Sequence, residues 1–408
     1  MRVYSALIVV ATLLVAAVLG VSAPFDASDF GGSVVFAQGG QAPSIPGDVL
    51  PGTTPREFEE FRLGQEDFRE IEEASEGLGP LFNGTGCASC HNVPAIGGGS
   101  PMTEMRAGAR NADGTFRIVG GTTLFQLFSI PDHRCQSVVP AEATVVARRM
   151  SVPLFGAGLI EAIPDETLLA LEDPFDRDRD GISGRAAIIT DVATGQRRVG
   201  RFGWKAQIAT LLTFSGDAYT NEMGITNDLF PEEPYGGITE ARMRECDRLK
   251  DPEDAVDPRT GKRAIDNFES FMKFLAPLSR GPITEEVATG EQVFVQVGCA
   301  SCHVPALTTG VNAVAALSRK TARLYSDLLL HDIGTVDGIA QEAAQPNEIR
   351  TPALWGLRFR RPLMHDGSAM TPAEALRQHG GEASAVMERY RTASEPLRRA
   401  LMAFLDSL

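Results

Sequence analysis

Two identical hexapeptides, Gly-Cys-Ala-Ser-Cys-His, stand at residues 86–91 and 298–303. Cys-x-x-Cys-His is the attachment pattern of haem c, in which the two thiols form thioethers with the vinyl groups and the histidine binds the iron. A redox dithiol needs no following histidine, and a zinc site needs four ligands in a different spacing. The sequence therefore predicts two covalently bound haem c groups. Their attachment residues are Cys87, Cys90 and His91 for the first haem and Cys299, Cys302 and His303 for the second.

The ligand on the other face of each iron decides what the haem can do, since a closed iron suits electron transfer and an open one suits peroxide or oxygen. After the second motif, the loop "RPLMHDGSAM" places Met364 beside His365, and only one of them can point at the iron. No ligand stands out for the first haem, which argues against two interchangeable carriers. For the first haem the candidates are Met102, Met105 and His133, or the site is open. The other histidines and methionines that could bind an iron are His331, His379 and Met370.

The N-terminus has the features of a secretory signal. Arg2 precedes an apolar run at 6–21, and small residues that suit cleavage follow it. The run is short for a bilayer span, which needs about 20 residues, so an uncleaved membrane anchor is the alternative. We expect residues 1–37 to be a signal peptide, 38–55 a flexible linker, and the mature protein to be periplasmic.

The bulk composition narrows the class of protein. The formal net charge is −15, which argues against nucleic acid as a partner. A length of 408 residues with 43% apolar residues indicates a globular chain with more than one domain. No glycine-rich phosphate loop or dinucleotide fingerprint follows a predicted strand, so a nucleotide cofactor is not expected.

Helical patterns precede both motifs. One helix begins at Thr54-Pro55, and a second carries Gly290 and Phe294 on its way to the second motif. The apolar residues of the first helix that recur at helical spacing are Phe58, Phe61, Phe68 and Ile71. Further helices are predicted at 205–219, at 264–280, within 371–408 and after Asp165 as N-cap, with short strands at 115–130 and 143–149.

Longer stretches of the chain resemble one protein family. They are "LGPLFNGTGCASCHNVPAIGGG", "FGAGLIEAIPDETLLAL", "GRFGWKAQ", "MGITNDLFPEE" and the stretch from "LLLHDIGTVDG" to "ALRQHGGEA". Together they closely resemble the bacterial dihaem c-type oxidoreductases of the thiol oxidoreductase and peroxidase type. That family is related to the dihaem cytochrome c peroxidases and to the dihaem enzyme that matures tryptophan tryptophylquinone. The resemblance runs from Phe58 to Gly381.

The resemblance implies a mainly α fold with two cytochrome c-like haem domains and a larger irregular α+β insertion between them. The N-terminal domain, with this extended middle region, would occupy 56–280, and the C-terminal domain 281–408. By the same resemblance, Met364 closes a high-potential C-terminal haem that takes electrons from a small redox protein, a cytochrome or a cupredoxin. The N-terminal haem faces a small substrate such as peroxide.

Three further residues receive roles in such an enzyme. In the relatives a tryptophan lies between the haems. Trp204 is the candidate for this position and Trp355 is the alternative. Either residue could instead be an ordinary packed core residue. Peroxide cleavage needs a proton-transfer group. Glu161, in an apolar segment where burial raises a carboxyl pKa, is the candidate, with Gln207 as a polar companion. A buried glutamate can equally hold backbone or an arginine.

The sequence therefore predicts an exported, peroxidase-like dihaem oxidoreductase. A non-enzymatic dihaem electron carrier with both irons closed is the alternative.

An acidic loop suggests a second kind of metal site. Asp176, Asp178 and Asp180 alternate before Gly181, as in the first half of a calcium-binding loop, although the twelfth position is Ala187 rather than glutamate. Related dihaem peroxidases hold a calcium ion, so calcium is a possible third cofactor. A solvated acidic turn is the alternative.

Two cysteines lie outside the haem motifs. In an oxidising compartment we expect Cys135 and Cys246 to form a disulfide. A reactive thiol pair is the alternative.

Overall fold

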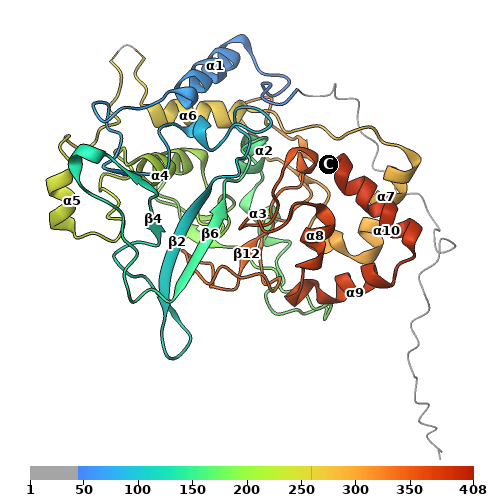
Figure 1. Cartoon of the computed structure of the whole chain (residues 1–408). Helices are drawn as coiled ribbons and strands as arrows, with labels where there is room; N and C mark the ends of the chain where they lie inside the picture. The colour runs from blue at the N-terminus through green and yellow to red at the C-terminus, as the bar shows by residue number, and fades with distance from the viewer. Residues whose placement is uncertain (1–44, 259) are drawn as a thin grey trace, which may run out of the picture.

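The computed structural model describes residues 45–408 other than residue 259. In Figure 1, helices α1, α4 and α6 gather at one end, helices α7, α8, α9 and α10 at the other, and the long strands β2 and β6 lie between. The helices are α1 (Pro55–Arg69), α2 (Ala157–Glu161), α3 (Asp165–Leu169), α4 (Leu211–Met223), α5 (Glu240–Cys246), α6 (Ala264–Phe274), α7 (Glu285–Val297), α8 (Pro372–Arg377), α9 (Ser384–Thr392) and α10 (Glu395–Ser407).

The strands are short apart from β2 and β6. They are β1 (Leu81–Phe82), β2 (Thr103–Arg110), β3 (Phe116–Arg117), β4 (Leu124–Phe125), β5 (Phe128–Ser129), β6 (Val145–Met150), β7 (Ile188–Thr190), β8 (Arg197–Val199), β9 (Leu307–Thr308), β10 (Thr321–Ala322), β11 (Leu330–His331) and β12 (Ile349–Arg350). Short 3-10 turns are η2 (Cys87–Ser89), η3 (Pro131–His133), η4 (Cys299–Ser301), η5 (Leu357–Phe359) and η6 (Gly381–Ala383). A mainly helical fold with several small sheets is therefore confirmed.

Helix α1 begins where the sequence predicts and packs on α6. The Thr54 side chain accepts a hydrogen bond from the first turn and caps the helix. Gly64 lets the two helices meet closely, because a Cβ at this position would lie 2.2 Å from the carbonyl oxygen of Asn267. The prediction for the apolar face holds in part. Phe61 and Phe68 are buried, whereas Phe58 and Ile71, which follows the end of the helix, are exposed.

Helix α7 repeats this arrangement before the second motif. It packs on α10, and a Cβ at Gly290 would lie 1.9 Å from the carbonyl oxygen of Ala400. The rings of Phe294 and Phe404 meet edge-on at 5.1 Å. The helix ends at Gly298, whose φ of 97° is the left-handed conformation that favours glycine, and the chain turns directly into the second motif. The predicted duplication is thus a pair of packed helices beside each motif.

An antiparallel sheet lies between the helical ends. Strand β2 pairs with β6 over six residue pairs, from Thr103–Met150 to Gly108–Val145. It also pairs with β3 and β4, so β2 is the central strand of this sheet. The short strands predicted at 115–130 and 143–149 are confirmed. Strand β2 was not predicted.

The helix predicted at 205–219 is shifted along the chain. It begins at Leu211, because the Thr210 side chain accepts a hydrogen bond from the backbone N–H of Thr213 and caps the first turn. Asp165 likewise is the first residue of α3 rather than its N-cap. The start of α4 is thus set by a capping contact that apolar periodicity does not show, whereas α3 begins after Pro164 without a side-chain cap.

The predicted domain boundary at residue 280 does not coincide with a break in the packing. A larger apolar core contains side chains from Leu50 to Leu329, and a smaller one contains side chains from Val287 to Leu408. Leu307 and Leu324 follow the predicted boundary but pack in the larger core. The division into two haem domains therefore stays a prediction.

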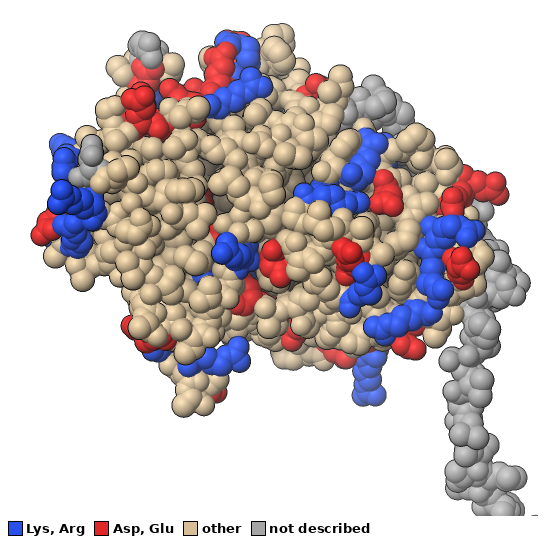
Figure 2. All heavy atoms as spheres, in the orientation of Figure 1, with Lys and Arg blue, Asp and Glu red and all other residues tan. Residues whose placement is uncertain are grey.

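The surface and the termini add three observations. On the face drawn in Figure 2, acidic and basic residues are interspersed over the C-terminal helices, and a broad uncharged area lies at the centre. Among residues 45–408 apart from 259, no helix is long and apolar enough to cross a membrane. The predicted signal peptide and residues 38–44 of the predicted linker lie outside the described residues.

Candidate functional site

Each Cys-x-x-Cys-His motif lines a cavity. The N-terminal cavity, of about 1260 Å³, has Cys87, Cys90 and His91 in its wall. The C-terminal cavity, of about 1250 Å³, has the equivalent residues Cys299, Cys302 and His303. Both cysteine pairs are free thiols rather than disulfides. Two cavities of equal size, each with two thiols and an imidazole in its wall, fit one haem c per motif.

The motif histidines are oriented as metal ligands usually are. The Nδ1–H of His91 donates to the carbonyl oxygen of Gly98 at 2.8 Å, and that of His303 donates to Tyr325 at 3.0 Å. Burial lowers the pKa of His91, and it lowers the pKa of His303 to about 4. A neutral imidazole with Nδ1–H held by a carbonyl keeps its Nε2 lone pair for a metal. Both rings therefore suit iron.

The C-terminal cavity contains several candidates for the second iron ligand, among them His365, the alternative to Met364 in the sequence. Met364 lies in its wall, as the sequence predicts, and so does His379. The Nδ1–H of His379 donates to the carbonyl oxygen of Ala375 at 2.8 Å, and burial lowers the pKa of the ring. This is the same orientation that the motif histidines have, so the Nε2 of His379 is available as a ligand. His379 is also close enough to lower the pKa of His303 electrostatically, after the larger effect of burial.

The predicted ligands of the first haem are dispersed. Met102 lines the N-terminal cavity, with its Sδ 4.0 Å from the Sγ of Cys90. Met105 packs instead in a small core beneath the central sheet. His133 lies in η3, where its carbonyl oxygen is 3.5 Å from the Sγ of Cys246, and it does not line this cavity.

Five charged residues that sequence reasoning missed line the N-terminal cavity, namely Glu104, Arg106, Arg149, Asp217 and Glu222. Glu104 and Arg106 stand on the same face of β2 and form two hydrogen bonds of 2.9 Å, and Asp217 and Glu222 project from α4. Burial opposes ionisation of Glu104, yet the Arg106 guanidinium lowers its pKa below the ordinary value. Burial, and next the charge of Glu104, raise the pKa of Glu222 to about 8. The cavity therefore contains a carboxylate pair that holds one proton at neutral pH.

Two neighbouring groups complete this acidic wall. The Nδ2–H of Asn83 donates to the carboxylate of Glu222 at 2.6 Å. Burial raises the pKa of Asp217 to about 6. Glu104 and Glu222 lie more than a hundred positions apart in the sequence. They meet only because β2 and α4 are neighbours in the folded chain.

The structure corrects the expectation for Glu161. Its carboxylate accepts a hydrogen bond of 2.7 Å from the backbone N–H of Leu211, the first residue of α4, and it lines neither cavity. Burial does raise its pKa, as expected. Its contact satisfies one of the unpaired N–H groups that every helix start presents. Gln207, its predicted companion, does line the N-terminal cavity, and its Oε1 accepts from the backbone N–H of Lys205.

Trp204 lines both cavities, and no other described residue does. Its indole N–H donates to the carbonyl oxygen of Met150 at 2.8 Å, and its ring meets that of His365 edge-on at 6.2 Å. The next residue, Lys205, is fully buried and pairs with Asp337 at 2.9 Å. Trp355, the alternative, lines neither cavity. The indole is therefore fixed in the position that the resemblance implies for the tryptophan between the haems.

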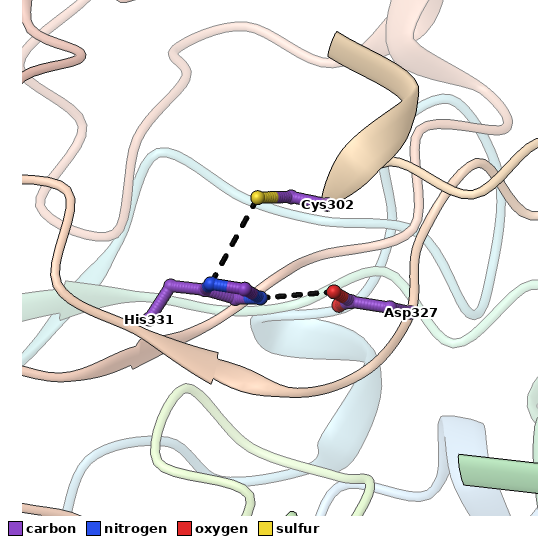
Figure 3. A group of neighbouring side chains, drawn as sticks. All are labelled: Cys302, Asp327 and His331. Carbon is purple, nitrogen blue, oxygen red and sulfur yellow. Dashed lines mark hydrogen bonds and ion pairs between the residues drawn. The ribbon is translucent and has the colours of Figure 1, made fainter. Parts of the chain in front are cut away.

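Beside the second motif, His331 lies between two carboxylates. Figure 3 shows Cys302, Asp327 and His331 as a compact group. The imidazole is 2.9 Å from Asp327 and 2.8 Å from Glu382, and these contacts raise its pKa well above the usual value even though burial opposes its charge. Gly184 leaves room for this ring, since a Cβ there would lie 2.4 Å from it. These contacts hold strand β11, which carries His331, at the edge of the C-terminal cavity.

The calcium loop and the spare cysteines lie apart from the cavities. The ligand atoms of Asp176, Asp178 and Asp180 are within 4.8 Å of one another, and each carboxylate accepts a hydrogen bond from a backbone N–H of the same loop. These contacts organise an acidic turn, and calcium stays a prediction. Cys135 and Cys246 form a disulfide, so the expected pairing is confirmed.

The family described as "Di-haem oxidoreductase, putative peroxidase" matches residues 129–408. The chain belongs to this dihaem oxidoreductase family. It is accordingly a peroxidase-type oxidoreductase with two haem cofactors, as the resemblance predicted. The match includes the second motif, and the first motif precedes it in the chain.

Several solved structures are similar to the chain at low identity. The diheme peroxidase BthA from Burkholderia thailandensis is 15% identical, with 90% of this chain and 89% of that chain covered and a TM-score of 0.41. Hydrazine synthase of Kuenenia stuttgartiensis is 15% identical, with 92% and 98% covered and a TM-score of 0.41. A MauG-like protein associated with microbial copper homeostasis is 17% identical, with 68% and 94% covered and a TM-score of 0.32. No curated protein sequence matches the chain.

Proposed function

We propose that this chain is an exported peroxidase with haem c attached covalently at both motifs. The observation that carries the proposal is the carboxylate pair of Glu104 and Glu222, which retains a proton at neutral pH in the same cavity as His91. An electron-transfer cytochrome has no need of a proton donor beside its haem. Export to the periplasm rests on the signal features of residues 1–37.

In the N-terminal cavity we assign the movement of protons to the carboxylate pair. A bound haem supplies the iron at which peroxide is reduced, and the overall reaction, H₂O₂ + 2 e⁻ + 2 H⁺ → 2 H₂O, consumes two protons. Glu222 donates one of them to the departing oxygen, because its raised pKa keeps it protonated at neutral pH. Glu104 stays ionised beside Arg106, so it can take up a proton and restore Glu222. Gln207 offers a further polar side chain in this wall.

In the C-terminal cavity we propose His379, rather than Met364, as the ligand opposite His303. Its Nδ1–H is already held by a backbone carbonyl, which fixes the ring and directs Nε2 away from that contact. Met364 has no such fixed orientation and packs against the apolar C-terminal core. A closed iron at this position suits electron entry.

Electrons reach the C-terminal haem from a small redox protein, a cytochrome or a cupredoxin, and pass to the N-terminal haem. Trp204 supports a path between the two haems because it lies in the wall of both cavities. Its hydrogen bond to Met150 and the buried ion pair of Lys205 keep it in place.

The spectrum of the reduced holoprotein tests this proposal. We expect two haems per chain that remain attached after denaturation, of which one binds carbon monoxide and one does not. We also expect hydrogen peroxide to be consumed with a reduced cytochrome or cupredoxin as donor. Two haems that both fail to bind carbon monoxide, with no peroxide turnover, would instead establish the electron-carrier alternative.

A further inference from the structure

Two arginines in the wall of the C-terminal cavity, of which Arg350 is buried and Arg360 is half-buried, have no carboxylate partner. Arg350 is 3% exposed, and its guanidinium donates only to the carbonyl oxygens of Gly203, at 2.7 Å, and Thr351, at 3.1 Å. The side chain of Arg360 makes no hydrogen bond or ion pair with any residue of the described chain, and its Nη2 is buried without a partner. Both line the C-terminal cavity.

Keeping these two guanidiniums away from water without a carboxylate partner reduces the stability of the folded chain. Burial lowers the pKa of Arg360 to about 10, and burial together with repulsion from Arg360 does the same for Arg350. Leaving a buried charge without its partner is strongly destabilising. Two buried arginines elsewhere in the chain each meet a carboxylate, since Arg149 pairs with Asp337 and Arg201 with Asp165. The C-terminal cavity is therefore built to receive an anion.

The position of the pair indicates which anion this is. Arg350 and Arg360 line the cavity that also contains the second Cys-x-x-Cys-His motif, and a haem carries two carboxylates, its propionates. A guanidinium presents a planar fork of donors that matches a carboxylate with two parallel hydrogen bonds. We propose that Arg350 and Arg360 bind the propionates of the C-terminal haem. This inference rests on the attachment of haem c at Cys299 and Cys302 proposed above.

The pair has a consequence for electron transfer. Reduction of a haem adds a negative charge, so a fixed cation beside it favours the reduced form and raises the midpoint potential. The guanidinium of Arg360 also lies 5.2 Å from the centre of the Trp204 ring. Propionate binding would place a carboxylate beside this cation and offset its effect on the indole. Arg360 is therefore positioned to influence both the C-terminal haem and the residue between the haems.

Spectroelectrochemical titration of the holoprotein tests the inference with three variants. We expect Arg360→Gln to lower one of the two midpoint potentials by at least about 59 mV, a tenfold change in the equilibrium of a one-electron couple. Arg360→Lys keeps the charge and should restore at least half of that shift. Arg361→Gln is the matched control, because Arg361 is 30% exposed, pairs with Asp406 and does not line the cavity. It should leave both potentials unchanged.

A second measurement separates a propionate contact from a general electrostatic effect. Resonance Raman bands of the haem propionates should shift in Arg360→Gln and not in Arg361→Gln. Unchanged bands and potentials in an Arg360→Gln protein that retains both haems would overturn the inference and leave the proposed peroxidase intact. A wild-type chain isolated without covalent haem at Cys299 and Cys302 would overturn the attachment itself, and the inference with it.

Discussion

Substitution of Glu222 by glutamine tests the proton donor of the N-terminal cavity. With a pKa of about 8, roughly nine-tenths of the Glu222 carboxyl groups are protonated at pH 7. A glutamic acid with the ordinary pKa of about 4.3 would be protonated in only roughly 0.2% of molecules at that pH. The cavity therefore raises the concentration of the donor by a factor of about 450, which lies within the range of about 100 to 10,000 that acid–base catalysis contributes. We expect Glu222→Gln to lower kcat for peroxide by a factor in that range.

The assay is steady-state peroxide reduction with a reduced donor, with carbon monoxide binding as the check that the haem site is intact. Glu161→Gln is the matched control, because Glu161 is also a buried glutamate of raised pKa but lines neither cavity. It should keep kcat within about threefold of the wild type. Because the active form of Glu222 is protonated, wild-type activity should fall as the pH rises through about 8. A loss smaller than tenfold in Glu222→Gln, with normal carbon monoxide binding, would refute the assignment.

Three further predictions concern the rest of the site. His379→Ala should open the C-terminal haem to carbon monoxide, whereas Met364→Ala should leave its spectrum unchanged; the opposite result would return the ligand role to Met364. Trp204→Phe removes the indole N–H bond to the backbone and should slow electron transfer between the haems in stopped-flow measurements without changing either attachment. Asp337→Asn leaves two buried cations without their carboxylate and should destabilise the protein by about 3–5 kcal/mol, measured by denaturant unfolding.

The features that the sequence predicts well are local ones. A Cys-x-x-Cys-His turn is complete within five residues, so its chemistry can be identified without a fold. Helices α1 and α7 were predictable because a capping threonine and an apolar face lie within one short segment, and α7 also ends at a glycine. Trp204 was found only through the resemblance, since nothing in its own neighbourhood distinguishes a tryptophan between two cavities from one in a core.

The catalytic carboxylates could not be found in this way. Glu104 lies on a strand whose pattern gave no signal, and Glu222 lies near the end of a helix whose predicted bounds stopped at 219. Their shared proton arises from burial and from each other, and so from the contact of β2 with α4. Glu161 was chosen as the proton-transfer group because it is an acidic residue in an apolar stretch. That pattern is the same whether the side chain faces a substrate or the start of a helix.

The two identical motifs acquire different chemistry from the walls around them. In the N-terminal cavity the wall is acidic, and a carboxylate pair keeps one proton available beside the haem site. In the C-terminal cavity the wall is mostly apolar, with His379 able to close the iron and Arg350 and Arg360 as unpaired cations. Cations beside a closed haem favour its reduced form. Carboxyl groups beside the other haem site favour a reaction that consumes protons. Trp204 belongs to both walls, so the division of work that we propose between the haems rests on side chains that lie outside both motifs.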